Sequence, residues 1–238
     1  MAMTDIKLIP LRCPDCGQGI ESGDDDVVHF CANCGKAFEV IQDKLKKVRV
    51  IFAKPEEEYA EVKLYYLPMW QILSSISIKK KHSIDVSQLP REILANKRFA
   101  SVYAELLNKE KPIEKMIFFV PAFGVTNRYQ LMDQPGLKFT INPPELKSDS
   151  VKNMVGAEYS LEDAIELAKD MFLSIQYKTD TGLTGLREAD IKFDYKKARI
   201  AGIPFYEEKG MLVDALQGYK IFKNGLKAWD RLKEKLDG

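Results

Sequence analysis

Four cysteines in two pairs carry the most recognisable chemistry in this sequence. Cys13 and Cys16 enclose two residues and precede a glycine, and Cys31 and Cys34 repeat this C-x-x-C-G pattern. Two intervening residues let one tight turn aim both thiols at a single ion, and the glycine suits a backbone with positive φ. Two such turns facing each other form the tetrahedral site typical of Zn²⁺. The spacing therefore predicts Cys13, Cys16, Cys31 and Cys34 as ligands of a structural zinc ion.

Iron is the alternative metal for the same four thiolates, which would make the chain an electron-transfer protein. Residues 13–41 resemble the zinc-ribbon family, whose C-P-x-C-G turn is called a rubredoxin knuckle. Rubredoxins share the knuckle, but they separate the two pairs more widely and pack an aromatic core around the metal. Here fourteen residues lie between Cys16 and Cys31, with Phe30 and Phe38 as the nearby aromatics. Zinc is therefore favoured over iron.

Other polar residues of the ribbon are expected to stay outside the metal site. His29 would be a superfluous fifth ligand, so we expect it on the surface of a strand. Asp24, Asp25 and Asp26 lack the alternating spacing of a calcium loop and are expected to form a solvated hairpin tip.

Local charge bears on the choice of partner. Residues 1–42 carry a net charge of −4, whereas the whole chain is close to neutral at +1. Affinity for nucleic acid rests on Lys and Arg side chains that neutralise phosphates, so an acidic ribbon favours a protein partner or a larger complex. Basic clusters at 44–49 and 79–81 keep a nucleic-acid-associated factor as an alternative.

Composition and length describe an ordinary globular protein. The 238 residues are 45% hydrophobic and 30% charged, which is enough to fill a core. The N-terminus lacks the features of a signal peptide, and no apolar run approaches the roughly 20 residues that cross a bilayer. Since the metal site uses every cysteine, none is left for a disulfide, and we expect a reducing compartment, the cytoplasm.

Catalytic signatures are missing from the sequence. It contains no phosphate-binding loop, dinucleotide fingerprint, nucleophile elbow or H-E-x-x-H motif. The histidines are His29 and His82, and no cysteine is free to act as a nucleophile. We therefore assign no catalytic and no cofactor-binding residues. The first hypothesis is a non-enzymatic adaptor or assembly subunit that uses its zinc ribbon for protein–protein contact.

The elements that must position the cysteines form two expected domains in an α+β fold. A small ribbon over residues 1–42 would contain strands at 27–30 and 36–41, followed by a charged connector at 43–47. The ribbon is too small to bury much apolar surface, so metal binding would supply most of its folding energy. This division predicts that Cys13→Ser or Cys34→Ser unfolds the ribbon and leaves the body folded.

The larger body, residues 48–238, is expected to be strand-rich with two or three packing helices. Apolar periodicity predicts helices over 90–108, from Ser160, where a serine cap precedes acidic residues, and from about Asn224. Strands are predicted at 48–53, 61–66, 67–78, 116–123, 137–141, 191–205 and 211–214.

Three segments of the body share an aliphatic–Pro–apolar–aromatic pattern: 66–70, 119–123 and 202–206. They are interpreted as equivalent bends in repeated β units, with coincidence as the alternative. On these segments the body loosely resembles uncharacterised bacterial proteins in which a zinc ribbon precedes a domain with repeated strand–Pro–aromatic segments. That resemblance implies no known reaction.

Overall fold

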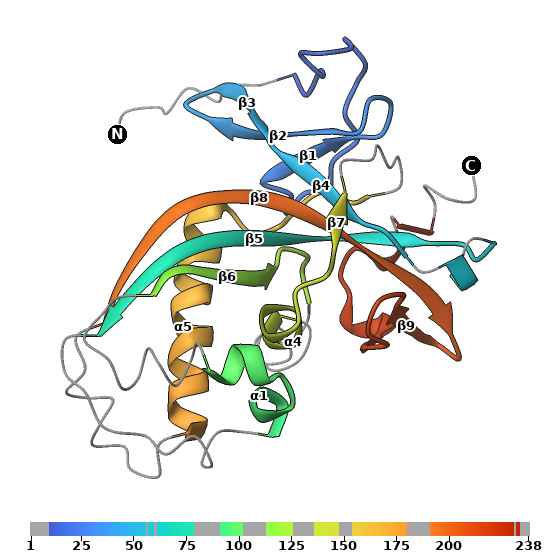
Figure 1. The fold of residues 1–238 in the computed structure, drawn as a ribbon. Helices are drawn as coiled ribbons and strands as arrows, with labels where there is room; N and C mark the ends of the chain where they lie inside the picture. The colour runs from blue at the N-terminus through green and yellow to red at the C-terminus, as the bar shows by residue number, and fades with distance from the viewer. Residues whose placement is uncertain are drawn as a thin grey trace.

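The computed structural model consists of two sheets with helices packed against the larger one (Figure 1). A three-stranded sheet belongs to the ribbon and a seven-stranded sheet to the body. This arrangement confirms the α+β class and the strand-rich body. The structure describes residues 10–55, 57–59, 61–78, 91–101, 113–125, 136–147, 154–179, 191–230 and 232–233.

The ribbon sheet is an antiparallel meander of β1 (Val28–Cys31), β2 (Lys36–Ile41) and β3 (Lys44–Val48). Gln42 and Asp43 both have positive φ, at 51° and 63°, which is the geometry of a tight hairpin turn. The connector predicted at 43–47 is therefore wrong: most of it is β3, which pairs with β2 over five residues. Its lysines suit an edge strand that meets water. The ribbon sheet thus continues past residue 42, while the division into two domains stays a prediction.

The strands of the body sheet are β4 (Val50–Ala53), β5 (Tyr65–Ile78), β6 (Ile113–Pro121), β7 (Leu146–Lys147), β8 (Ile191–Glu208), β9 (Met211–Asp214) and β10 (Lys220–Phe222). The sheet is built on the long antiparallel pair of β5 and β8. β6 pairs with the other edge of β5, and β4 runs parallel to β8 beside residues 200–202. β5 is one strand where the sequence indicated two. Lys209 and Gly210, with positive φ, make the hairpin turn between β8 and β9.

The three proline segments meet in the middle of this sheet. Pro68 of β5 lies opposite Gly202 of β8, and Met69 lies opposite Pro121 of β6. Proline has no amide proton, but its carbonyl still accepts: Pro68 O receives the Ala122 amide at 3.0 Å. The segments are therefore neighbours in space, and their equivalence as repeated units stays a prediction.

Helix α5 (Leu161–Thr179) begins where the sequence predicted it. Ser160 Oγ accepts the Asp163 amide at 3.1 Å, and the Asp163 carboxylate accepts the Ser160 amide at 3.1 Å. This reciprocal cap satisfies amides that the first helical turn leaves free. α5 lies along one face of β8, β5 and β6 (Figure 1), and its apolar stripe packs on Trp70, Ile72, Phe118 and Val120.

The remaining helices are short. α1 (Arg91–Ala95) and a helical turn at 97–101 lie in the predicted 90–108 region, with a break at Asn96. Residues 102–108 lie outside the described part. At the C-terminal end, the 3₁₀ turn Lys223–Gly225 replaces the start of the helix expected from Asn224, and helical residues follow at 229–230 and 232–233.

The strand predicted at 137–141 is wrong, because Leu137–Ile141 forms helix α4. Thr140 Oγ1 donates to the Gly136 carbonyl at 2.7 Å and accepts the Phe119 amide of β6 at 3.0 Å. The helix thus supplies a partner for the edge of β6. Apolar Leu137, Phe139 and Ile141 alternate with polar Lys138 and Thr140, which is the period of a strand, so the local pattern predicted a strand where tertiary contacts favour a helix.

The ribbon and the body share a hydrophobic core. Val28, Phe30 and Ala37 of the ribbon are buried in the same cluster as Trp70 and the apolar stripe of α5. Phe30 also makes an edge-to-face contact with Phe52 of β4, with ring centroids 6.4 Å apart. Removing these side chains from water favours close association of the two parts.

Backbone pairing completes this junction. Val28 and Ala157 exchange two hydrogen bonds, at 2.8 and 3.0 Å. Gly156 beside them leaves no room for a side chain: an added Cβ would lie 2.4 Å from Asp26 Oδ2 and 2.7 Å from Val28 O. The ribbon can therefore approach the body closely only because residue 156 is glycine.

We expect Gly156→Ala to lower the free energy of unfolding by about 1–3 kcal/mol, because the methyl group overpacks the junction. Chemical denaturation of the full chain measures this. Gly19→Ala is the matched control, since an added Cβ at Gly19 has nothing within 4 Å. Equal stability of the two variants would contradict the tight junction.

Candidate metal centre

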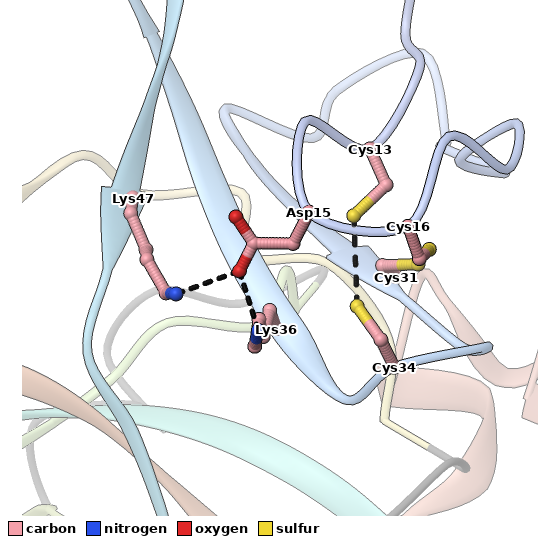
Figure 2. A network of polar contacts seen from close by, with 7 residues as sticks. All are labelled: Cys13, Asp15, Cys16, Cys31, Cys34, Lys36 and Lys47. Atoms are coloured by element: carbon pink, nitrogen blue, oxygen red, sulfur yellow. Dashed lines mark hydrogen bonds and ion pairs between the residues drawn. The ribbon is translucent and has the colours of Figure 1, made fainter.

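Two matching turns carry the cysteines. The amide of Gly17 donates to the Cys13 carbonyl at 2.8 Å, and the amide of Gly35 donates to the Cys31 carbonyl at 2.8 Å. Both glycines have the expected positive φ, 74° and 69°. This conformation is strained for residues with a Cβ, which explains why glycine follows each pair. The second turn connects β1 to β2, so the ribbon hairpin holds it opposite the first (Figure 2).

The four sulfur atoms converge as a metal site requires. Cys13 Sγ lies 3.5 Å from Cys34 Sγ, Cys16 Sγ lies 3.6 Å from Cys31 Sγ, and all four lie within 4.8 Å of one another. A tetrahedral ion with Zn–S bonds of about 2.3 Å separates its sulfurs by about 3.8 Å. A disulfide would need about 2.05 Å. The arrangement is thus zinc-ribbon-like and could bind a metal ion, and neither close pair is a disulfide.

The protein environment does not favour ionisation of all four thiols at the same time. Burial raises the pKa of Cys34 to about 12 and also raises the pKa of Cys31, whereas a hydrogen bond from the Asn33 side chain lowers the pKa of Cys16 to about 6. Since metal ligands must be thiolates, a bound cation would stabilise the ionised forms that burial disfavours. Cys13 and Cys31 are buried, and Cys16 and Cys34 are partly exposed.

Asp15 ties the first knuckle to the ribbon sheet. Its carboxylate contacts Lys36 Nζ of β2 at 2.5 Å and Lys47 Nζ of β3 at 2.7 Å (Figure 2), and these hydrogen bonds lower its pKa. The sequence alone did not indicate this ion-pair contact. Asp15 was visible between the cysteines, but its partners come together only through the register of β2 and β3.

The other polar residues of the ribbon differ from expectation. His29 is buried rather than on a strand surface, and its Nδ1 lies 2.6 Å from Ser22 Oγ. Burial lowers the pKa of His29. The tip at 24–26 is only partly solvated: Asp26 is buried and accepts the Gly23 amide at 2.7 Å, while Asp25 contacts Lys227 of the body at 3.1 Å. None of these groups belongs to the cysteine cluster.

Of the two basic clusters predicted as a nucleic-acid surface, only 44–49 lies in the described part of the chain, because 79–81 fall outside it. Within 44–49, Lys47 is paired with Asp15, and Lys44 and Lys46 are exposed on β3. The cluster is therefore divided between a structural ion pair and a solvated strand.

Comparison with known proteins assigns the chain to no family, because no family model, curated protein or solved structure matches it. Within the ranges that the structure describes, no helix is long and apolar enough to cross a membrane.

Metal analysis of the purified protein should give about one zinc per chain and no absorbance in the visible region, because four thiolates with this spacing favour Zn²⁺. Iron in comparable amount, with a coloured protein, would overturn the assignment and favour the electron-transfer interpretation.

The shared core changes what we expect from loss of one ligand. Cys13→Ser should lose the metal and also lower the Tm of the body, because the hairpin that carries the second knuckle packs in the body's core. Ala32→Ser places a hydroxyl at an exposed position of the second knuckle and is the matched control. Calorimetry of both variants decides: an unchanged body transition in Cys13→Ser would favour two independent domains.

Proposed function

We propose that this chain is a non-enzymatic adaptor or assembly subunit whose ribbon, held by a structural zinc ion on Cys13, Cys16, Cys31 and Cys34, mediates contact with a protein partner. The observation that carries the proposal is the convergence of four thiols within 4.8 Å. A tetrahedral ion bound by four protein ligands has no open position for water or substrate, unlike a catalytic zinc. The ion would therefore stabilise shape and perform no reaction.

The placement of the ribbon supports a docking role. β1 is anchored to the body by the shared core and by the Val28–Ala157 pairing. The ribbon is therefore held in a fixed position on the body and is not a loosely tethered module. Glu21 and Asp24 are exposed beside the hairpin tip. Carboxylates of this kind attract and orient a partner with a basic surface and disfavour nucleic acid.

A reducing compartment such as the cytoplasm fits this proposal. Four thiolate ligands must stay reduced to hold the metal, and oxidising conditions would convert neighbouring thiols to disulfides.

The acidic ribbon should be needed for a stoichiometric complex. We expect the tagged full chain, purified from its native cells, to carry a defined protein partner, seen by native mass spectrometry. Glu21→Gln combined with Asp24→Asn should reduce the recovered complex about tenfold, because rim charges steer association.

The charge-matched control is Glu57→Gln combined with Glu145→Gln, which removes two exposed carboxylates from the body. This control should retain the complex. A chain that is recovered alone and monomeric, or a complex that both double variants weaken equally, would contradict the adaptor role of the ribbon.

A further inference from the structure

The sheet face opposite α5 contains a basic groove. It has a volume of about 460 Å³ and runs over β8, β5 and β6 near the start of β4. We define the groove by its lining residues: Arg49, Gln71, Leu73, Ile117, Tyr195, Lys196, Lys197, Ala198 and Arg199. Four of these nine are cationic, and no carboxylate is among the described residues that line it.

Strand register places the groove side chains in two cross-strand rows. Arg199 of β8 lies opposite Gln71 of β5, and Lys197 lies opposite Leu73, which in turn lies opposite Ile117 of β6. Directly opposite residues of antiparallel strands share a face. The groove therefore has a cationic side along β8 and an apolar floor from Leu73 and Ile117.

Arg199 is held in position for an anion. Its Nε donates to Gln71 Oε1 at 2.6 Å, which orients the guanidinium and leaves its two terminal nitrogens available for an anion. Burial, followed by the neighbouring charge of Arg49, lowers the pKa of Arg199. The guanidiniums of Arg49 and Arg199 repel each other, and they have no acidic partner among the described residues. A phosphate bound between them would stabilise both charges.

The cations are spread both along β8 and across to the start of β4. Arg199 and Lys197 are two residues apart on one strand, a distance of about 7 Å, and Arg49 lies beside the same stretch because its carbonyl accepts the Ile200 amide at 2.8 Å. Lys196 contributes less, since it is paired with Asp194 at 2.5 Å. Cations spread over this distance suit a chain of phosphates better than one small anion.

The apolar floor indicates which part of the ligand lies beside the phosphates. Ile117 of β6 and Tyr195 of β8 are 36% and 41% exposed, so the groove presents large apolar side chains to a ligand. Bases of a single strand can pack on such surfaces while their phosphates meet the cations. A duplex hides its bases and offers no group for this floor.

We propose that the groove between Arg49, Arg199, Lys197 and the Leu73–Ile117 floor binds single-stranded nucleic acid. This site differs from the ribbon surface of the proposed adaptor function, and its failure would leave that function untouched.

Fluorescence anisotropy with a labelled 12-nucleotide oligo(dT) and the zinc-loaded full chain tests the groove. Three phosphate contacts predict a slope of about −2 in a plot of log K against log salt concentration. Arg49→Ala combined with Lys197→Ala should weaken binding at least tenfold and reduce the slope to about −0.7.

Lys44→Ala combined with Lys46→Ala is the charge-matched control, because both lysines are exposed on β3 outside the groove. It should change affinity less than about twofold. Arg199→Lys, which keeps the charge but loses the planar fork, should weaken binding without lowering the Tm.

Four results would overturn the proposal. The first is the absence of salt-dependent binding, and the second is an equal loss of oligo(dT) affinity in the groove and β3 double variants. The third is equal affinity for a duplex of the same length, and the fourth is competition by poly-glutamate as effective as that by unlabelled oligo(dT). The last result would assign the groove to an acidic peptide.

Discussion

The antiparallel pairing of β5 with β8 is the constraint on which the rest of the body depends. It brings two of the proline segments together and gives β6 an edge to join. It also separates the sheet into two faces, because side chains alternate along each strand. One face packs against α5, and the other carries the groove in which Gln71 and Arg199 meet. A shift of register by one residue would exchange the two faces.

The ribbon depends on a different balance of forces. Among the ribbon residues that the structure describes, its own core has the buried members Cys13, Ile20, Cys31 and Phe38, which is too little to stabilise a domain without the metal. The body supplies further burial through Val28, Phe30 and Ala37. Metal binding and packing against the body therefore both stabilise the ribbon hairpin. Loss of the metal is expected to weaken the packing, and loss of the packing is expected to weaken metal binding.

Basic residues that are close in sequence have separate roles in space. Lys47 turns to Asp15 and holds a knuckle, whereas Arg49, two residues later, joins the ribbon sheet to the body sheet and lines the groove. The chain leaves the ribbon sheet after Val48 and enters the body sheet at Val50, so Lys47 and Arg49 belong to different surroundings. A charge cluster counted along the sequence, such as 44–49, is thus a poor guide to a charged surface.

The sequence by itself determined the cysteine quartet, the two glycines with positive φ and the cap of α5, because each depends on residues within a few positions of one another. It also indicated the α+β class through the periods of its apolar residues. Tertiary structure decided the rest. Leu137–Ile141 became a helix because Thr140 meets β6, and residues 44–48 became a strand because β2 offers an edge. His29 is buried and contacts Ser22, seven residues earlier, which only the fold brings beside it. The groove joins Arg49 to Arg199, which are distant in sequence, so only the pairing of β4, β5 and β8 could reveal it.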